Sequence, residues 1–166
     1  MADRNVKLAE QVHDLLRSRG ASVATAESLT GGQLAVLLTA APGSSESFLG
    51  GVVSYATALK TDLLGVPQSI VDRDGVVSAA CARAMAEGVR RLTGSTYAMS
   101  TTGVAGPERQ EGKPPGTVYV AVAGPAGVTA LSLELSGGRG AIQQRTCGEA
   151  LAALAQVLRE EETPLR

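Results

Sequence analysis

Aromatic side chains are nearly absent from this chain, which has no Trp, one Phe and three Tyr among its 166 residues. Proteins that hold single-stranded nucleic acid stack the bases on aromatic rings, so this composition excludes a stacking surface. An excess of positive charge is missing as well, because 15 basic and 16 acidic residues give a formal net charge of -1. A protein whose main task is to bind nucleic acid needs a basic surface. We therefore expect no nucleic-acid partner.

Cysteines and long apolar runs are also scarce. The two cysteines, Cys81 and Cys147, lie far apart in segments with a helical pattern. This is typical of small core residues in a reducing compartment rather than of a disulfide. No apolar run approaches the ~20 residues of a membrane helix, and the N-terminus leads into an amphipathic helix rather than a signal peptide. We expect a cytoplasmic protein with no membrane partner.

Histidine occurs once, as His13. It lies in the first predicted helix beside charged neighbours, so we expect it at the surface or at the boundary of the core. No group of His, Cys, Asp and Glu residues has the spacing of metal ligands. The sequence therefore predicts no metal and no cofactor.

Segments with strand and helix patterns alternate along the chain. Strands are expected at residues 22–26, 48–55, 95–101, 117–123 and 128–135, and helices at 5–19, 30–40, 57–64, 78–91 and 141–158. This alternation predicts an α/β fold in a single domain over residues 1–166. We expect a three-layer α/β/α sandwich with a mixed, mostly parallel sheet of about five strands. In such sheets ligands bind at the carboxyl ends of the strands.

The segment Thr-Ala-Glu-Ser-Leu-Thr-Gly-Gly, which contains Ser28, predicts a buried strand, a glycine turn and then a helix. Ser28 is then expected at a helix start, where unpaired N–H groups and the helix dipole stabilise a phosphate, a carboxylate or a developing oxyanion. A serine at such a place can cap the helix, bind a ligand or attack one. Spacing alone favours the cap.

A serine that attacks needs a base, and Lys60 is the candidate. It lies among apolar and small residues, and removal from water lowers the pKa of a lysine toward neutrality. Tyr55, five residues earlier, would orient the lysine or pass a proton. The alternative is that Tyr55 only ends a strand and Lys60 is an exposed helix charge, and spacing alone favours this alternative.

A second group of candidates lies in glycine-rich loops. Thr102, Gly103 and Gly106 stand just after a predicted strand, and Arg139 lies in Ser-Gly-Gly-Arg-Gly before the last helix. Glycines allow a ligand to approach the backbone, and the guanidinium fork of arginine suits a phosphate or a carboxylate. No loop matches a Walker motif or a dinucleotide fingerprint. Turn glycines and a surface arginine are therefore the alternative interpretation.

Taken in order, the motifs resemble the C-terminal domain of competence/damage-inducible protein A, the CinA family. The matching blocks run from about Val23 to Arg139. They are Thr-Ala-Glu-Ser-Leu-Thr-Gly-Gly, Gly-Gly-Val-Val-Ser-Tyr with a lysine five residues on, Leu-Leu-Gly-Val, Gly-Val-Val-Ser, Ala-Met-Ala-Glu-Gly, Thr-Gly-Val-Ala-Gly-Pro and Lys-Pro-Pro-Gly-Thr-Val.

The resemblance implies a stand-alone nicotinamide-nucleotide amidase of the pyridine nucleotide cycle. Such an enzyme hydrolyses the carboxamide of nicotinamide mononucleotide to nicotinic acid mononucleotide and ammonia, without a metal or a cofactor. The resemblance further implies a small-molecule nucleotide as substrate and a homo-oligomeric assembly. Carried onto this chain, the catalytic residues are Ser28, Lys60 and Tyr55. The substrate-binding residues are Thr30, Gly31, Gly32, Thr102, Gly103, Gly106 and Arg139.

The chain departs from the usual pattern of that family at several positions. Leu29 stands where Cys is common, Thr57 where Asn is common, Gly138 where Asp is usual and Gln143 where Arg is usual. The last three border the predicted pocket, and we expect them to weaken an ion pair or a phosphate contact. They keep open a second interpretation, a catalytically inactive nucleotide-binding or interaction module linked to competence or the damage response. We expect the chain to correspond to the amidase part alone, without the larger N-terminal domain of longer members.

Overall fold

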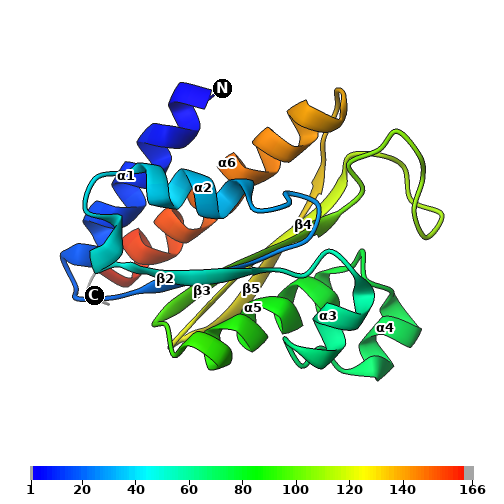
Figure 1. Ribbon diagram of the computed structural model, residues 1–166, viewed down its shortest axis with the longest axis horizontal. Helices are drawn as coiled ribbons and strands as arrows, with labels where there is room; N and C mark the ends of the chain where they lie inside the picture. The colour runs from blue at the N-terminus through cyan, green and yellow to red at the C-terminus, as the bar shows by residue number, and fades with distance from the viewer. Residues whose placement is uncertain (1, 163–166) are drawn as a thin grey trace.

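The computed structural model describes residues 2–162 and contains a five-stranded sheet between helical layers (Figure 1). In chain order the elements are α1 (Ala2–Arg17), β1 (Val23–Glu27), α2 (Gln33–Ala40), the 3-10 helix η1 (Ser44–Glu46), β2 (Phe48–Val53), α3 (Thr57–Asp62), α4 (Gln68–Asp74), α5 (Ala79–Thr93), β3 (Tyr97–Gly103), β4 (Thr117–Gly124), β5 (Gly127–Glu134) and α6 (Arg139–Glu162).

The sheet has the strand order β2-β1-β3-β4-β5. β1 pairs in parallel with β2 and β3, whereas β4 pairs antiparallel with β3 and β5. β5 therefore runs in the same direction as β1, β2 and β3, and β4 runs against them. This confirms the prediction of a mixed, mostly parallel sheet. It also brings the carboxyl ends of β1, β2 and β3 to one end of the sheet.

Helices cover both faces of this sheet. In Figure 1, α1, α2 and α6 lie on one face and α3, α4 and α5 on the other. The larger apolar core lies under the first group and contains Leu34 and Cys147, and the core under α5 contains Met85 and Cys81. Both cysteines are buried and unbridged, as small core residues. The predicted three-layer α/β/α sandwich is confirmed.

Helix α3, which carries Lys60, is held close to α5. Gly88 of α5 packs so tightly on the turn after α3 that a Cβ atom there would lie 2.0 Å from the carbonyl oxygen of Leu64. A residue with a side chain would push the two helices apart. The start of α5 is fixed by Ser78, whose hydroxyl oxygen accepts the N–H of Cys81 at 3.1 Å. These contacts set the position from which the Lys60 side chain extends.

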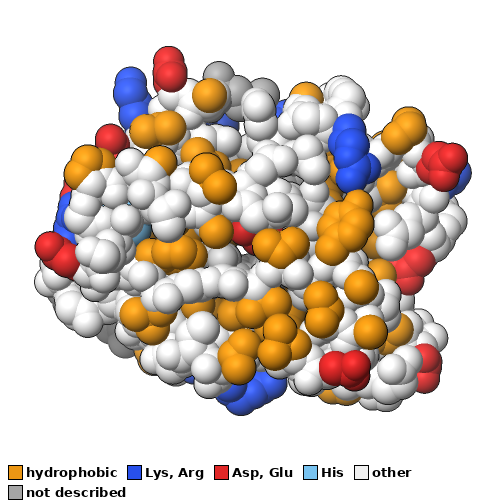
Figure 2. Space-filling model, in the orientation of Figure 1, with side chains coloured by type: hydrophobic (Ala, Val, Ile, Leu, Met, Phe, Trp, Pro, Cys, Tyr) orange, Lys and Arg blue, Asp and Glu red, His pale blue; other side chains and the backbone are white. Residues whose placement is uncertain are grey.

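β2 forms one edge of the sheet and presents apolar side chains to the outside. Leu49 and Val53 of β2 are 52% and 45% exposed, and Leu59 and Leu63 in and just after α3 are 42% and 45% exposed. Figure 2 shows apolar side chains gathered across this face of the molecule. The strand has neither the charges nor the proline that commonly protect an edge strand from pairing.

The prediction for His13 is wrong. Its side chain is 1% exposed, and its ring nitrogens lie 2.5 Å from Oγ of Ser47 and 2.7 Å from the carbonyl oxygen of Leu38. Burial results from the packing of α2 against α1. The residue pattern within α1 does not reveal this contact, because the covering residues come from a distant part of the chain.

Three element boundaries differ from the prediction in ways that affect the site. Helix α2 begins at Gln33 rather than at residue 30, β3 extends through Thr102 and Gly103, and α6 begins at Arg139. Helix α4 is an element that the sequence patterns do not predict. Within residues 2–162, no helix combines the length and the apolar character needed to cross a bilayer.

Candidate active site

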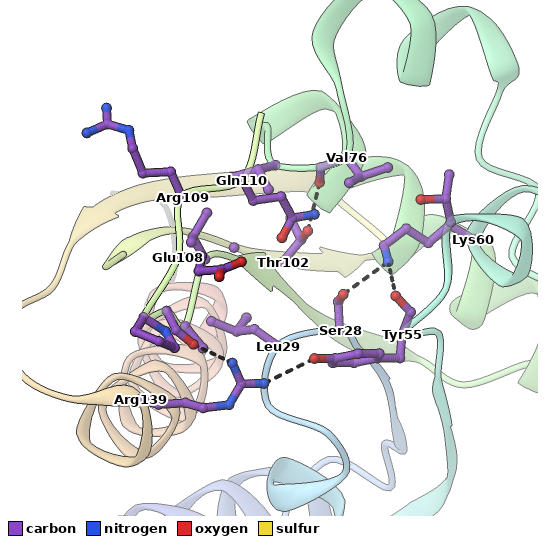
Figure 3. A pocket seen from close by; sticks show the side chains of 17 residues that line it. Ser28, Leu29, Tyr55, Lys60, Val76, Thr102, Glu108, Arg109, Gln110 and Arg139 are labelled. Atoms are coloured by element: carbon purple, nitrogen blue, oxygen red, sulfur yellow. Dashed lines mark hydrogen bonds between the residues drawn. The ribbon is translucent and has the colours of Figure 1, made fainter. Parts of the chain in front are cut away.

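A cavity of about 420 Å³ opens at the carboxyl ends of the parallel strands (Figure 3). Small-molecule sites typically measure about 300–1,000 Å³. The walls come from the segments that follow β1, β2 and β3, from α3, from the segment before α5 and from the start of α6. The lining residues are Ser28, Leu29, Tyr55, Thr57, Lys60, Val76, Val77, residues 102–110 and Arg139.

Ser28 and Lys60 meet in the wall of this cavity. Nζ of Lys60 lies 3.0 Å from Oγ of Ser28, 2.6 Å from the carbonyl oxygen of Ser54 and 3.3 Å from that of Tyr55. The Lys60 side chain is 1% exposed. The structure therefore brings together the serine and the lysine that the sequence singled out, and it makes Lys60 a buried residue rather than an exposed helix charge.

Burial also changes the acidity of Lys60. Removal from water lowers the pKa of Lys60 below its ordinary value of 10.5, and this effect outweighs the nearby groups that would raise it. A neutral amine has two N–H bonds and one lone pair. If the two N–H bonds donate to the carbonyls of Ser54 and Tyr55, the lone pair faces Oγ of Ser28. The lysine can then accept the serine proton.

Tyr55 contributes two different groups to the site. Its carbonyl oxygen accepts from Lys60, whereas its hydroxyl oxygen accepts a hydrogen bond from Nη2 of Arg139 at 3.0 Å. Nη1 of Arg139 donates to the carbonyl oxygen of Gly106 at 2.6 Å. In Figure 3 the Tyr55 hydroxyl points to Arg139 and away from Lys60. The backbone of Tyr55 thus orients the lysine, and its phenol lies at the rim with Arg139.

The prediction that Ser28 lies at a helix start is wrong. Ser28 follows β1 directly, and α2 begins only at Gln33 after a turn formed by two glycines. The N–H groups of Leu34 and Ala35 donate to the carboxylate of Glu27, at 2.8 and 3.1 Å. The first turn of α2 is therefore satisfied by a carboxylate of the protein itself.

Thr30, Gly31 and Gly32 are not among the residues that line the cavity. Thr30 is fully buried, and its hydroxyl donates to Glu27 at 2.7 Å. Gly31 and Gly32 have φ angles of +58° and +102°, a backbone region that side chains disfavour. These three residues shape the turn after Ser28 instead of facing the cavity.

The other predicted binding residues do line the cavity. Thr102, Gly103 and Gly106 form one wall and Arg139 lies at the rim. The Thr102 hydroxyl donates to the carbonyl oxygen of Val76 at 2.7 Å, which ties this wall to the segment before α5.

Two positions that depart from the family pattern also have defined places. Nε2 of Gln143 donates to the carbonyl oxygen of Leu29 at 2.9 Å. Gln143 therefore supports the backbone directly after Ser28. Thr57 lines the cavity beside Lys60.

Sequence reasoning missed two carboxylates that hold the walls, Glu27 and Glu111. The Glu111 carboxylate accepts the N–H groups of Val76 and Val77 at 3.1 and 2.7 Å, and the Lys113 amine donates to the carbonyl oxygen of Val77. These bonds fasten the loop after β3 to the segment before α5. The one signal for Glu27 was an acidic residue directly after the strand predicted at residues 22–26, whereas the loop around Glu111 gave none. Across residues 2–162, no three His, Cys, Asp or Glu side chains are grouped as a metal site requires.

The chain matches the model of the CinA C-terminal domain over residues 5–158. A CinA-like protein of Frankia casuarinae is 47% identical over 144 residues, which cover 87% of this chain and 33% of that protein. A CinA-like protein of a Synechococcus species is 49% identical over 150 residues, which cover 89% of this chain and 36% of that protein. The chain thus spans about a third of the length of these curated relatives.

Solved structures match over nearly the whole chain. A competence-damaged protein (CinA) superfamily protein from Klebsiella pneumoniae is 32% identical with a TM-score of 0.91, and the match covers 94% of this chain and 98% of that one. The competence/damage inducible protein CihA from Agrobacterium tumefaciens is 34% identical with a TM-score of 0.88, with coverage of 94% and 96%.

Proposed function

The chain belongs to the CinA C-terminal domain family, and on that premise we propose that its cavity is the active site of a serine amidase. Its proposed reaction hydrolyses the carboxamide of nicotinamide mononucleotide to nicotinic acid mononucleotide and ammonia. One observation carries the proposal: Nζ of the buried Lys60 lies 3.0 Å from Oγ of Ser28. Burying a charged amine costs free energy. A buried lysine with a lowered pKa in the wall of a cavity is therefore a candidate for a functional residue.

In the proposed reaction, Oγ of Ser28 attacks the carboxamide carbon while Lys60 accepts the serine proton. When the tetrahedral intermediate collapses, the C–N bond breaks and Lys60 returns that proton to the leaving nitrogen, which departs as ammonia. The acyl group now forms an ester with Ser28. Lys60 next takes a proton from water, whose oxygen attacks the ester carbon. The ester C–O bond then breaks, Lys60 returns that proton to Oγ of Ser28, and the acid product loses its own proton, which gives the carboxylate and free Ser28.

The rim of the cavity supports a phosphorylated substrate. Arg139 donates from Nη1 to Gly106 and from Nη2 to Tyr55, which leaves further N–H groups of its guanidinium for an anion. Arg109 lines the same cavity. In the mononucleotide the nicotinamide ring is a cation, so it withdraws electrons from the carboxamide and favours attack by Ser28. A phosphate held at Arg139 would hold the substrate by the end opposite to the amide.

The test is an ammonia assay with purified protein and nicotinamide mononucleotide, with free nicotinamide as the second substrate. We expect ammonia from the mononucleotide and little from nicotinamide, because nicotinamide lacks the phosphate. Binding of the mononucleotide without release of ammonia would favour the inactive nucleotide-binding module instead.

The role of Lys60 is tested by Lys60→Arg. Arginine keeps the positive charge but does not lose its proton under these conditions, so we expect kcat to fall by at least about 100-fold. Lys7→Arg, on the exposed face of α1, is the matched control. A variant Lys60→Arg with near wild-type kcat and a raised KM would make Lys60 a substrate anchor and contradict the proposed base.

A further inference from the structure

We propose that Glu27 is a positioning residue that holds Ser28 in place for attack. The inference rests on the proposed function in one respect, that Ser28 is the nucleophile. Glu27 is 1% exposed and is not among the residues that line the cavity. It therefore acts through its neighbours and not by touching the substrate.

Both oxygens of the Glu27 carboxylate accept hydrogen bonds from the protein. Oε1 accepts the hydroxyl of Thr30 at 2.7 Å and the N–H of Leu34 at 2.8 Å, and Oε2 accepts the N–H of Ala35 at 3.1 Å. The N–H groups at the start of a helix and its dipole stabilise a negative charge. The carboxylate of Glu27 therefore bonds to the start of α2, which begins five residues after Ser28.

The hydroxyl groups around Glu27 form a chain with a fixed direction. Thr30 has one hydroxyl proton and donates it to Glu27, so Oγ1 of Thr30 can only accept from Oγ1 of Thr101, 2.8 Å away. Oγ1 of Thr101 in turn lies 3.4 Å from the N–H of Ser28, whose main acceptor is the Thr101 carbonyl oxygen at 3.0 Å. The direction is therefore Thr101 to Thr30 to Glu27.

This chain of hydrogen bonds joins the residues on both sides of the nucleophile. Glu27 precedes Ser28, Thr30 follows it, and Thr101 on β3 holds its backbone N–H. The carbonyl oxygen of Ser28 also accepts the N–H of Gly31 at 3.1 Å. With its N–H and C=O both hydrogen-bonded, the backbone of Ser28 is held in one place relative to Nζ of Lys60.

The same contacts exclude one place for the substrate anion. The N–H groups of Leu34 and Ala35 at the start of α2 are occupied by Glu27. An anion of the substrate is therefore not held there, although a glycine turn before a helix is a common phosphate site. The rim at Arg139 stays the proposed place for this anion.

Glu27→Gln tests the positioning role with almost no change in shape. The amide group must face either the N–H of Ala35 or the hydroxyl and N–H donors on the other side, so a donor meets a donor in either orientation. Thr30→Val removes the hydroxyl that joins Thr101 to Glu27, whereas Thr30→Ser keeps it. Glu161→Gln is the matched control, because Glu161 accepts the Tyr97 hydroxyl far from the cavity.

The measurements are kcat and KM for the mononucleotide and the rate at which a fluorophosphonate probe labels Ser28, located by peptide mass spectrometry. We expect Glu27→Gln to lower kcat and the labelling rate together by about 10- to 100-fold, with KM changed by less than about threefold. Thr30→Val is expected to behave alike and Thr30→Ser to recover most of the rate. Melting temperatures identify any variant that fails to fold.

The outcomes separate this inference from the proposed function. If wild-type Ser28 reacts with the probe and Glu27→Gln reacts at the same rate, the positioning role is wrong and the proposed function stands. If Glu27→Gln does not fold, unchanged labelling in a folded Thr30→Val overturns the role in the same way. If Glu161→Gln lowers the labelling rate as much, the effect is general destabilisation, which also overturns it. A wild-type protein that neither labels at Ser28 nor releases ammonia contradicts the proposed function, and the positioning role with it.

Discussion

The two sides of the cavity are built in opposite ways. On one side, Lys60 is 1% exposed with its amine on Oγ of Ser28 and the carbonyl oxygen of Ser54, while the backbone N–H of Ser28 at the end of β1 donates to Thr101 of β3. On the other side, Tyr55 is 61% exposed, and Arg139 meets it at the solvent-facing rim. The buried side is arranged before any substrate arrives. The rim keeps its charged groups exposed, where a substrate could reach them.

The difference follows from the chemistry of the two cations. A lysine loses its proton readily when water is removed, whereas an arginine stays charged and suits an exposed contact with an anion. If the buried side performs the reaction and the rim holds the substrate, substitutions on the two sides should change different kinetic constants.

The largest effect is expected from Ser28→Ala, which removes the attacking oxygen and leaves the backbone contacts of the turn. We expect turnover of the mononucleotide to fall by at least about 1,000-fold. The Kd of the nucleotide, measured by calorimetry, should change by less than about threefold, because the rim is untouched.

Two results would contradict this division of tasks between the buried side and the rim. Turnover that survives Ser28→Ala rules out a covalent serine mechanism. A loss of nucleotide binding as large as the loss of turnover means that the buried side also recognises the substrate, so the two tasks are not divided between the two sides.

The next largest effect is expected from Arg139→Ala at the rim. The variant loses the guanidinium that we propose as the partner of the substrate anion, together with its bonds to Tyr55 and Gly106. We expect KM for the mononucleotide to rise by about 10- to 100-fold, with a much smaller change in kcat. Nicotinamide riboside, which lacks the phosphate, is the control substrate. Its kcat/KM should be nearly the same in the variant and the wild type, and an equal loss on both substrates would contradict the assignment.

A smaller effect is expected from Glu111→Ala, which releases the wall loop from the N–H groups of Val76 and Val77. Leaving these N–H groups without a partner destabilises the wall by about 1–3 kcal/mol. We expect KM to rise a few-fold with kcat retained. Glu10→Ala on exposed α1 serves as control. A fall in kcat with unchanged KM would instead link this loop to the buried side.

Much of the fold is predictable because local signals agree with it. Gly20 and Gly94 follow the helices that the periodicity indicates, and both have the positive φ of helix ends. The β-branched run at residues 117–123 predicts β4 closely. Helix α4 was missed because it is a short, polar segment after Pro67 with no buried residue. No apolar stripe identifies it.

Residue chemistry made the buried pair in the site a candidate, but spacing alone favoured a helix cap and an exposed lysine, and only the resemblance to the family favoured the pair. Ser28 and Lys60 stood out because a serine nucleophile needs a base and the chain has one histidine. The prediction of a free helix start beside Ser28 was wrong, because Glu27 at the end of β1 accepts the N–H groups of Leu34 and Ala35. Thr30, which the resemblance placed among the substrate-binding residues, instead donates its hydroxyl to Glu27. Which side a hydroxyl faces depends on strand pairing, and β1 pairs with β3 across more than 70 residues of sequence.

The smallest effect concerns stability and tests whether the buried side is as dry as its geometry indicates. Burial lowers the pKa of Lys60 below the value of 10.5 that it has when unfolded. Between these two values the unfolded chain binds one more proton, so wild-type stability rises with pH there and is lost as pH falls. The slope is at most about 1.4 kcal/mol per pH unit, or about 3–6 °C in Tm. Lys60→Met lacks this slope because methionine does not titrate, and Ser28→Ala keeps it because Lys60 stays buried.

The measurement is the Tm of the three proteins as a function of pH. As the pH rises toward 10.5, we expect the Tm of the wild type to increase relative to that of Lys60→Met, and the Tm of Ser28→Ala to follow the wild type. Parallel curves for all three proteins would mean that water reaches Lys60, and that the two sides of the cavity differ less than their contacts suggest.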